Sequence, residues 1–481
     1  MKDAPPSLIL ATSNGTGMGH LARQLAVGLA AIPKARVTLF SLSVALPTAT
    51  EQGIPGEFCP GPDRGWIPES SWPHYLAGRL TALAEEVNAD LIVFDGVAPY
   101  RGFALARDRI PETAFAWFRR GMWQQGVNAG QLWKSGLFDL IIEPGDLART
   151  ADRGPTANLR DAVQVPPVSL LEVVERLPRQ EAAKFLGLDS SRRSVLLTLG
   201  TGRLGDVTGP GEVILNTVLE YTDWQVCVAT SAIAETSISA SPHERVTELR
   251  GVFPLVRYLS AFDAVISAAG YNAVHEYIPA GLPTLLVPNR LTRTDDQVGR
   301  SDYLARTGLA LTPSDESSEQ LSYVVRQLLD REVRSNLQTA IRRMPPDALT
   351  GGASSTAALL AELAVAHAPA KMSLGTRFRR VRDNSKETLK RQLGTGGTNR
   401  VRRLLGRPPI EAANRLRVVL DDSAVSTTRT GVRSLRITSE VDVSTLLGTD
   451  PIEHIVSEPS DSYLSARRRL IDRHYEVVSP V

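Results

Sequence analysis

Short apolar runs alternate with amphipathic stretches along the first 165 residues of the chain. Runs bounded by Gly, Pro or charged residues predict buried strands at residues 7–10, 36–40, 90–96, 113–118 and 139–145. Between them, residues 74–87 place apolar side chains at helical spacing, which predicts an amphipathic helix. Strands that alternate with helices are typical of a parallel sheet covered on both faces.

The same alternation starts again after a proline-marked crossing at residues 165–179. Strands are predicted at 194–202, 224–230, 262–270 and 283–289, and helices at 211–221, 271–277, 317–344 and 355–368. We therefore expect an α/β chain with two Rossmann-like, doubly wound domains facing a cleft, plus a C-terminal extension. The expected divisions are a first domain (1–165), a linker (166–192), a second domain (193–370), a basic linker (371–410) and an extension of unknown role (411–481).

The length, hydrophobic content and cysteine count of the chain fit a cytoplasmic protein of two or three domains. The chain has 481 residues, and its hydrophobic content of 42% is enough for sizeable cores. Only Cys59 and Cys227 are present, so a disulfide framework is not expected and a reducing compartment fits. No apolar run suits a signal peptide or a bilayer-crossing helix, and no Cys/His cluster resembles a metal site.

Charge is spread unevenly although the net charge is only +2. Residues 371–407 hold 12 Lys or Arg against two acids, a local charge of +10, which leaves −8 for the remainder. Such a stretch can hold anionic lipid or nucleic acid, but a solvated helix face or linker is the commoner case and is favoured here. We expect no nucleic-acid partner, and a peripheral contact with the inner membrane face is a hypothesis.

A glycine-rich loop, "SNGTGMGH", follows the first predicted strand. Gly15, Gly17 and Gly19 let the backbone approach a ligand closely, and His20 lies near a helix N-terminus, where unpaired amides favour anions. A dinucleotide fingerprint needs glycine where His20 stands, and no acid follows about 20 residues on, so NAD is disfavoured. Alone, the loop fits a tight turn and a ligand site equally well. A second glycine loop ends the strand at 194–202, and we expect both loops to face one ligand.

The most informative segment is residues 262–311. A strand ends at Gly270, and the amides of the helix that follows are suited to a phosphate. Glu276 lies one to two turns into that helix, where a carboxylate accepts two hydrogen bonds from a ribose diol. "AGLP" at 280–283 ends the helix, and "TDDQ" at 294–297 supplies short polar side chains that suit sugar hydroxyls.

These motifs resemble the nucleotide-sugar-dependent glycosyltransferases of family 28, whose best-known member transfers N-acetylglucosamine in lipid II assembly. The resemblance covers residues 7 to about 365 and is strongest in 262–311 and 15–23. It implies a GT-B fold, a nucleotide-sugar donor that is UDP-linked, a hydroxyl acceptor and inversion at the anomeric carbon. The acceptor itself is not written in the sequence: a cell-envelope, polysaccharide or natural-product hydroxyl is expected, and the basic stretch suggests, as a hypothesis, a lipid-linked or polymeric one. The chain departs from the family in its "GTGMGH" loop and at Arg300, near which the best-known members have asparagine.

The resemblance also assigns roles to residues. It implies nucleotide-sugar contacts at Gly17, Gly19, Gly200, Thr201, Gly202, Phe253, Gly270, Tyr271, Asn272, Glu276, Asp296 and Gln297. His20 titrates near neutral pH and is a candidate general base. Asp95 ends the strand "LIVFD". It either orients His20 or caps a turn, and the sequence supports the two interpretations equally.

Several alternatives stay open at this stage. No D-x-D triplet occurs, which disfavours a metal-dependent transferase, and we expect neither metal nor cofactor. His20 with Arg23 also fits the "G-x-G-H-x-x-R" spelling of nucleotide-sugar hydrolases and epimerases, and a non-catalytic partner of another transferase is a third hypothesis. His275 is expected to be a satisfied helix residue. Core packing is favoured over an acceptor platform for three tryptophans (117, 123 and 133), and Arg119 and Arg120 either bind an anionic acceptor or are solvated.

Overall fold

The computed structural model describes residues 4–13, 17–62, 67–234, 238, 243–366, 415–420, 427–429, 432–437 and 452–457. Gly15 and the basic stretch 371–407 lie outside these residues. Residues 460–478, whose pattern predicts a last helix, also lie outside them.

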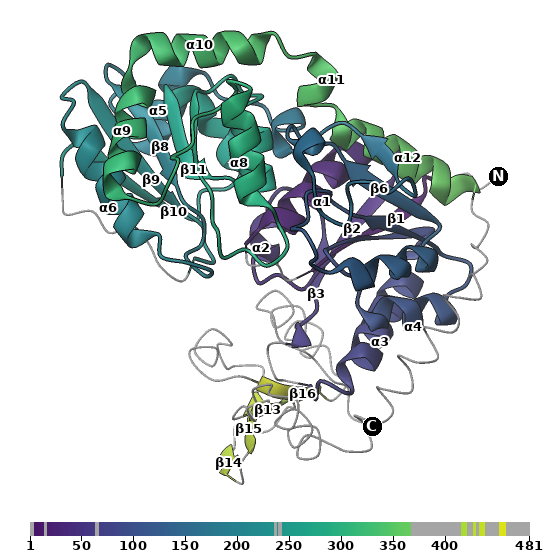
Figure 1. Ribbon diagram of the computed structural model, residues 1–481. Coiled ribbons are helices and arrows are strands. Elements are labelled where there is room, and N and C mark those ends of the chain that lie inside the picture. The colour runs from purple at the N-terminus through teal and green to yellow at the C-terminus, as the bar shows by residue number, and fades with distance from the viewer. Residues whose placement is uncertain are drawn as a thin grey trace.

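The first domain is a seven-stranded parallel sheet with helices on both faces (Figure 1). Its strand order is β3-β2-β1-β4-β5-β6-β7. The strands are β1 (Ser7–Thr12), β2 (Arg36–Ser41), β3 (Gly56–Phe58), β4 (Leu91–Asp95), β5 (Ala114–Phe118), β6 (Leu140–Pro144) and β7 (Val163–Val165). The helices are α1 (Gly19–Ala31), α2 (Leu46–Thr50), α3 (Trp72–Val87) and α4 (Arg101–Arg109), with 3-10 turns η2 (Ala129–Leu137), η3 (Arg149–Ala151) and η4 (Leu170–Glu172).

Alternate residues of each strand enter opposite layers of the core. Leu8 and Leu10 of β1 pack in one layer with α1, whereas Ile9 and Ala11 pack in the other with α3. All four side chains are fully buried. A strand covered on both faces gains from apolar residues at every position, which is why this segment is a continuous apolar run rather than an alternating one.

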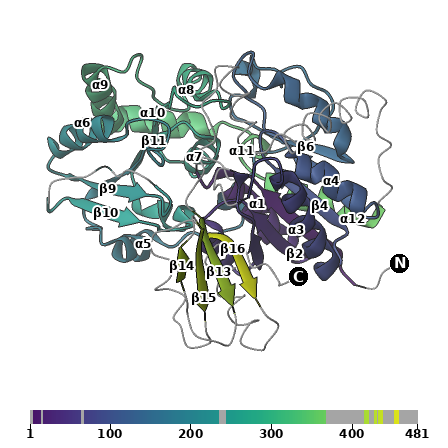
Figure 2. The same cartoon turned by 90° about the horizontal axis from the view of Figure 1, so that it is seen from below.

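The second domain repeats the plan with five parallel strands in the order β10-β9-β8-β11-β12. The strands are β8 (Arg193–Thr198), β9 (Trp224–Thr230), β10 (Val246–Arg250), β11 (Ala264–Ala268) and β12 (Thr284–Val287). Its helices are α5 (Arg179–Leu186), α6 (Thr208–Leu219), α7 (Tyr271–Tyr277), α8 (Gln297–Arg306), α9 (Ser318–Leu329), α10 (Arg331–Arg342) and α11 (Pro346–Leu349), with one 3-10 turn, η5 (Leu255–Ala261). The last helix, α12 (Gly352–Ala366), lies on the first domain. Figure 2 shows the two sheets side by side.

The chain crosses between the domains twice, at adjacent points. After α11 it returns to the first domain, where α12 packs against α1 (Figure 1). A Cβ atom on Gly352 would lie 2.1 Å from the Pro166 carbonyl oxygen, so the close approach of the two crossings requires glycine. Glu172 accepts hydrogen bonds from the Ala353 and Ser354 amides, both at 2.9 Å, and caps α12.

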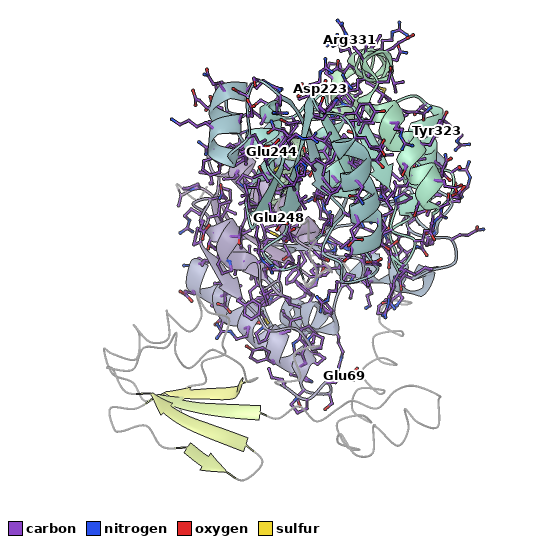
Figure 3. The ribbon with its side chains drawn as sticks, turned by 90° about the vertical axis from the view of Figure 1, so that its left-hand side faces the viewer. Glu69, Asp223, Glu244, Glu248, Tyr323 and Arg331 are labelled. Carbon is purple, nitrogen blue, oxygen red and sulfur yellow. The ribbon has the colours of Figure 1, made fainter. Side chains whose placement is uncertain are left out.

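The prediction of one helix over residues 317–344 is wrong, because the segment forms two helices. The break is at Asp330, whose backbone is extended and whose carboxylate accepts hydrogen bonds from the Glu332 and Val333 amides. Because Asp330 caps the N-terminus of α10 with an extended backbone, α9 cannot continue through it. Tyr323 on α9, Arg331 at the start of α10 and Asp223 in the loop before β9 are exposed at the surface of the second domain (Figure 3).

The described residues beyond 366 form a four-stranded sheet of β13 (Arg415–Leu420), β14 (Thr427–Arg429), β15 (Val432–Ile437) and β16 (Ile452–Ser457). Its order is β14-β15-β13-β16, and only β14 runs antiparallel to its neighbour. The sequence of residues 415–441 is rich in Ser, Thr and β-branched residues and predicts strands, and β13, β14 and β15 lie there, whereas β16 lies beyond it. Among all described residues, none of the helices combines the length and the apolar character needed to cross a bilayer.

Candidate active site

A cavity of about 270 Å³ opens between the two domains at the carboxyl ends of their strands. Seven residues predicted to bind the nucleotide sugar line it: Gly17, Gly19, Gly200, Thr201, Phe253, Asn272 and Glu276. Three more side chains of the first domain, Ala22, Thr48 and Leu170, close the opposite wall. Apolar surface dominates the lining, which is typical of ligand pockets with a few placed polar groups.

The two glycine loops meet at this cavity, as the sequence predicts. A Cβ atom on Gly17 would lie 3.7 Å from the Thr201 methyl carbon, so a side chain there would fill the gap between the loops. Gly200 has a φ of +99°, a conformation that glycine adopts without strain. Gly202 also has a positive φ, of +70°, but lies outside the cavity lining.

His20 and Asp95 form a pair beside the cavity. The carboxyl end of β4 places Asp95 against the first turn of α1, and His20 Nδ1 lies 2.6 Å from Asp95 Oδ1. The Asp95 side chain is 1% exposed and that of His20 is 16% exposed. Two groups approach Nδ1: Asp95, which only accepts hydrogen bonds, and Arg23 Nη2 at 2.8 Å, which only donates. Since Arg23 Nη2 also has Asp95 Oδ1 as an acceptor at 2.8 Å, we assign the hydrogen to Nδ1 and the lone pair to Nε2. The orienting interpretation of Asp95 therefore fits the geometry.

Arg23, one turn after His20, completes this cluster. Its guanidinium binds Asp95 with two hydrogen bonds, Nε to Oδ2 at 3.1 Å and Nη2 to Oδ1 at 2.8 Å. Burial opposes ionisation of Asp95, but Arg23 and His20 outweigh it and lower the pKa of Asp95 to about 2. Burial lowers the pKa of His20 below its ordinary value despite Asp95, and Arg23 and Arg120 add to the effect. At neutral pH His20 is thus uncharged and able to accept a proton.

Glu276 faces the cavity from α7. The side chain is half-buried, and its carboxylate has no hydrogen bond or ion pair to another described residue. Burial in the apolar lining raises the pKa of Glu276 to about 8. An acid held there at a cost in stability is more consistent with a ligand contact than with a surface glutamate.

Other residues of α7 join the domains rather than face the cavity. The Tyr271 hydroxyl donates to the Gly145 carbonyl at 2.9 Å and accepts from the Val168 amide at 3.0 Å. Its phenol therefore binds the first domain, and only its main chain is available to a ligand. His275 is fully buried with both ring nitrogens bonded, Nδ1 to the Tyr271 carbonyl at 2.6 Å and Nε2 to the Leu147 amide at 3.0 Å. The prediction of a satisfied histidine is confirmed.

A buried ionic network holds the domains together next to this helix. Arg300, fully buried in α8, contacts Asp146 Oδ2 and Asp295 Oδ1, both at 2.9 Å. Arg120 also contacts Asp295 Oδ1, at 3.0 Å. Burial opposes ionisation of Asp295, but Arg120 and Arg300 lower its pKa to about 2. The position at which the chain departs from the family, Arg300, is thus an interdomain contact.

The "TDDQ" loop is fixed by its surroundings. Asp296 caps α8, with Oδ1 accepting from the Gly299 amide at 2.9 Å. The Gln297 side chain accepts from the Asn289 amide at 3.0 Å, and its nitrogen would lie 3.8 Å from a Cβ atom on Gly270. Gly270, Asp296 and Gln297 therefore lie together but outside the cavity lining, and their contact with a donor sugar stays a prediction.

Both interpretations of Arg119 and Arg120 as free surface cations are wrong. Arg119 is fully buried and bonds Asp161, while Arg120 pairs with Asp295. Core packing is confirmed for Trp117 and Trp123, which are 0% and 1% exposed, and Trp133 is half-buried against the same core.

Sequence reasoning missed the ionic partners of these residues. Asp146 directly follows the predicted strand 139–145, and residues at the carboxyl ends of strands were the available signal. Asp295 and Arg23 belong to the "TDDQ" and "G-x-G-H-x-x-R" motifs, but the sequence does not indicate which charged residues they pair with. Within the described residues, no group of three or more His, Cys, Asp or Glu side chains is arranged to hold a metal ion.

Comparison with known proteins supports a transferase fold. No family model matches the chain. Two curated relatives are UDP-N-acetylglucosamine–N-acetylmuramyl-(pentapeptide) pyrophosphoryl-undecaprenol N-acetylglucosamine transferases. The one from Methylococcus capsulatus is 37% identical over 83 residues, 17% of this chain and 23% of the relative. The one from Staphylococcus haemolyticus is 26% identical over 163 residues, 34% and 44% of the two chains. The chain thus spans less than half the length of the curated relatives it matches.

Solved glycosyltransferases match a much larger part of the chain. Phytolacca americana UGT2, complexed with UDP-2fluoro-glucose and pterostilbene, aligns with a TM-score of 0.54 at 14% identity, over 76% of this chain and all of the other. The kitacinnamycin glycotransferase aligns with a TM-score of 0.52 at 14% identity, over 74% and 99%. VinC in complex with dTDP aligns with a TM-score of 0.50 at 18% identity, over 75% and 100%. With two facing parallel sheets, these matches show that the chain has the GT-B fold of glycosyltransferases.

Proposed function

We propose that this protein is an inverting glycosyltransferase that moves a sugar from a nucleoside diphosphate, UDP by preference, to a hydroxyl acceptor. One observation carries the proposal: an unpartnered acid, Glu276, lines the cavity between two glycine loops, and a neutral histidine with an aspartate partner, His20, directly follows Gly19 of that lining. The first suits a ribose and the second suits a proton transfer.

Donor binding is assigned to the cavity itself. Burial keeps Glu276 protonated in the empty cavity, and we assign it to the ribose: it releases its proton to solvent when the two ribose hydroxyls donate hydrogen bonds to its oxygens. Phe253 lines the same cavity and is assigned to the nucleobase as an apolar cover. The diphosphate is assigned to the main chain after Gly270 and to the loop at Gly200. The printed ligands of UGT2 and VinC, UDP-2fluoro-glucose and dTDP, support a nucleoside diphosphate as the ligand class.

In the proposed reaction, the acceptor hydroxyl gives its proton to Nε2 of His20. The acceptor oxygen bonds to the anomeric carbon while the bond from that carbon to the diphosphate breaks, so the configuration inverts. Asp95 fixes the Nδ1–H tautomer and stabilises the imidazolium that forms. The residues named supply every step without a metal ion, and sugar transfer that persists in EDTA is the result expected.

The first experiment is a binding screen with UDP, dTDP and GDP, followed by incubation with the matching nucleotide sugars. We expect tight binding of one nucleotide, slow release of free sugar without acceptor, and faster turnover with a hydroxyl acceptor. Rapid release of free sugar without acceptor would favour a hydrolase. Activity or phenotype that survives both His20→Ala and Glu276→Gln would favour a non-catalytic partner of another transferase.

The acceptor is proposed to be lipid-linked or polymeric and to lie at the inner face of the membrane. The basic stretch 371–407, with its local charge of +10, supports this by attraction to anionic lipids. A natural-product acceptor is the alternative, and assays with lipid-linked and soluble acceptors side by side distinguish the two.

A further inference from the structure

Asn272 and Arg23 form a contact between the domains at the His20–Asp95 pair. Asn272 is in the first turn of α7, in the second domain, but both of its side-chain hydrogen bonds reach the first domain. Its Oδ1 accepts from Arg23 Nη1 at 3.3 Å, and its Nδ2 donates to the Gly19 carbonyl at 3.2 Å. The second bond holds the residue directly before His20.

The Arg23 guanidinium is buried, and Asp95 and Asn272 engage its nitrogens. Its side chain is 2% exposed, and its guanidinium lies over the Tyr271 ring at 5.2 Å. Nε and Nη2 are used by Asp95, Nη2 also lies 2.8 Å from His20 Nδ1, and Nη1 is used by Asn272. A guanidinium presents these donors in one rigid plane, so a shift of Asn272 is passed to the carboxylate that orients His20.

The same helix carries the proposed ribose contact. Asn272 and Glu276 are four residues apart on α7, so they lie on one face of the helix, and both line the cavity. A ligand that binds Glu276 and fixes the position of α7 therefore also fixes the position of the Asn272 side chain.

We propose that Arg23 is a positioning residue and that Asn272 couples the position of the donor-binding helix to the geometry of the His20–Asp95 pair. The inference rests on the proposed function, because that function gives His20 its role. The contact is already formed in this ligand-free structure, so a donor that fills the cavity acts on the base through α7, and the base is left poorly oriented when the Asn272 side chain is displaced.

The ionisation of His20 reports this coupling without any substrate. The charged groups that act on His20 are Asp95 from β4, Arg23 from its own helix α1, and Arg120 after β5. From α7, Tyr271 and Asn272 reach this cluster through Arg23. Loss of the Asn272 bonds loosens the Arg23 fork and admits water, and both effects favour the charged imidazole.

The test uses 15N-histidine NMR titration of the full chain, with His20 assigned among the seven histidines through His20→Gln. We expect Asn272→Ala to raise the pKa of His20 by about half a pH unit or more, and Arg23→Lys, which keeps the charge but not the fork, to raise it as well. The matched control is Asn128→Ala, which removes another hydrogen bond between the domains, from Asn128 Nδ2 to Thr294 Oγ1 at 2.9 Å. It is expected to leave the pKa of His20 in place.

A pKa of His20 that stays within about 0.2 pH units of wild type in Asn272→Ala overturns the inference, as does an equal shift in Asn128→Ala. UDP then separates the two proposals. UDP that binds wild type and shifts the His20 signal, but shifts it less in Asn272→Ala, supports the coupling. UDP that binds without moving that signal overturns the coupling alone. Failure of every nucleotide to bind overturns the proposed function, while the unliganded titration still decides the coupling.

Discussion

Replacing the ionisable side chain of Glu276 by glutamine should stabilise the protein above pH 5 while it impairs the site. The pKa of this carboxyl is raised from 4.5 to about 8 by burial, so the folded protein holds a proton that the unfolded chain releases. Between these two values, stability therefore falls as the pH rises. The full shift corresponds to about 4–5 kcal/mol at pH 8, and because the side chain is only half-buried we expect about 2–4 kcal/mol.

The assay is urea unfolding followed by tryptophan fluorescence, for wild type and Glu276→Gln at pH 5, 6, 7 and 8. Glutamine keeps the shape of the neutral acid and does not titrate. The difference in unfolding free energy should be smallest at pH 5 and should grow in favour of Glu276→Gln by about 1 kcal/mol per pH unit up to pH 8. We expect the more stable Glu276→Gln variant to be less active, because active-site acids commonly lower stability for the sake of function.

Glu244→Gln is the matched control, because Glu244 is exposed on the outer face of the second domain (Figure 3). It should change the unfolding free energy little at any of the four pH values. A difference between Glu276→Gln and wild type that stays flat from pH 5 to pH 8 would refute the assignment of a buried, protonated acid at the cavity.

Four further outcomes are expected. Binding of UDP should exceed that of 2′-deoxy-UDP by about 10–100-fold in wild type, and calorimetry should show this gap shrinking in Glu276→Gln. His20→Ala should lower kcat by about 10²–10⁴-fold in a transfer assay while UDP affinity is kept; unchanged kcat would remove His20 as the base. Arg300→Leu, which leaves Asp146 facing a neutral side chain, should destabilise the fold by about 3–5 kcal/mol, against about 1 kcal/mol or less for Arg326→Leu in an exposed pair with Glu220. Replacing Arg377, Arg379, Arg380 and Arg382 by Gln should reduce co-sedimentation with anionic vesicles, and equal co-sedimentation would count against a membrane contact.

Strands and glycine loops could be predicted from the sequence because each depends on residues that are neighbours along the chain. A buried parallel strand is a continuous apolar run, as in β1 and β11, and the glycine loops mark strand ends in both domains. Helix boundaries were harder to predict, and Asp330 shows why. The charged face continues through it, and only its capping carboxylate separates α9 from α10.

Contacts between distant residues could not be predicted in this way. Arg300 and Asp146 are 154 positions apart, and Arg23 and Asn272 are 249 apart. Nothing in the spacing of such residues indicates which cation meets which carboxylate, because the pairing is decided by how the two domains dock. The same limit explains why the sequence predicts accessible cations at Arg119 and Arg120, although each is paired with an acid from another segment.

A crystal structure of the protein soaked with UDP tests the central claim most directly. We predict that the nucleotide occupies the cavity between the domains, with the Glu276 carboxylate at hydrogen-bond distance from both ribose hydroxyls and the diphosphate against the loops at Gly200 and Gly270. A nucleotide bound elsewhere, or a cavity that stays empty at saturating UDP, dTDP and GDP, would contradict it.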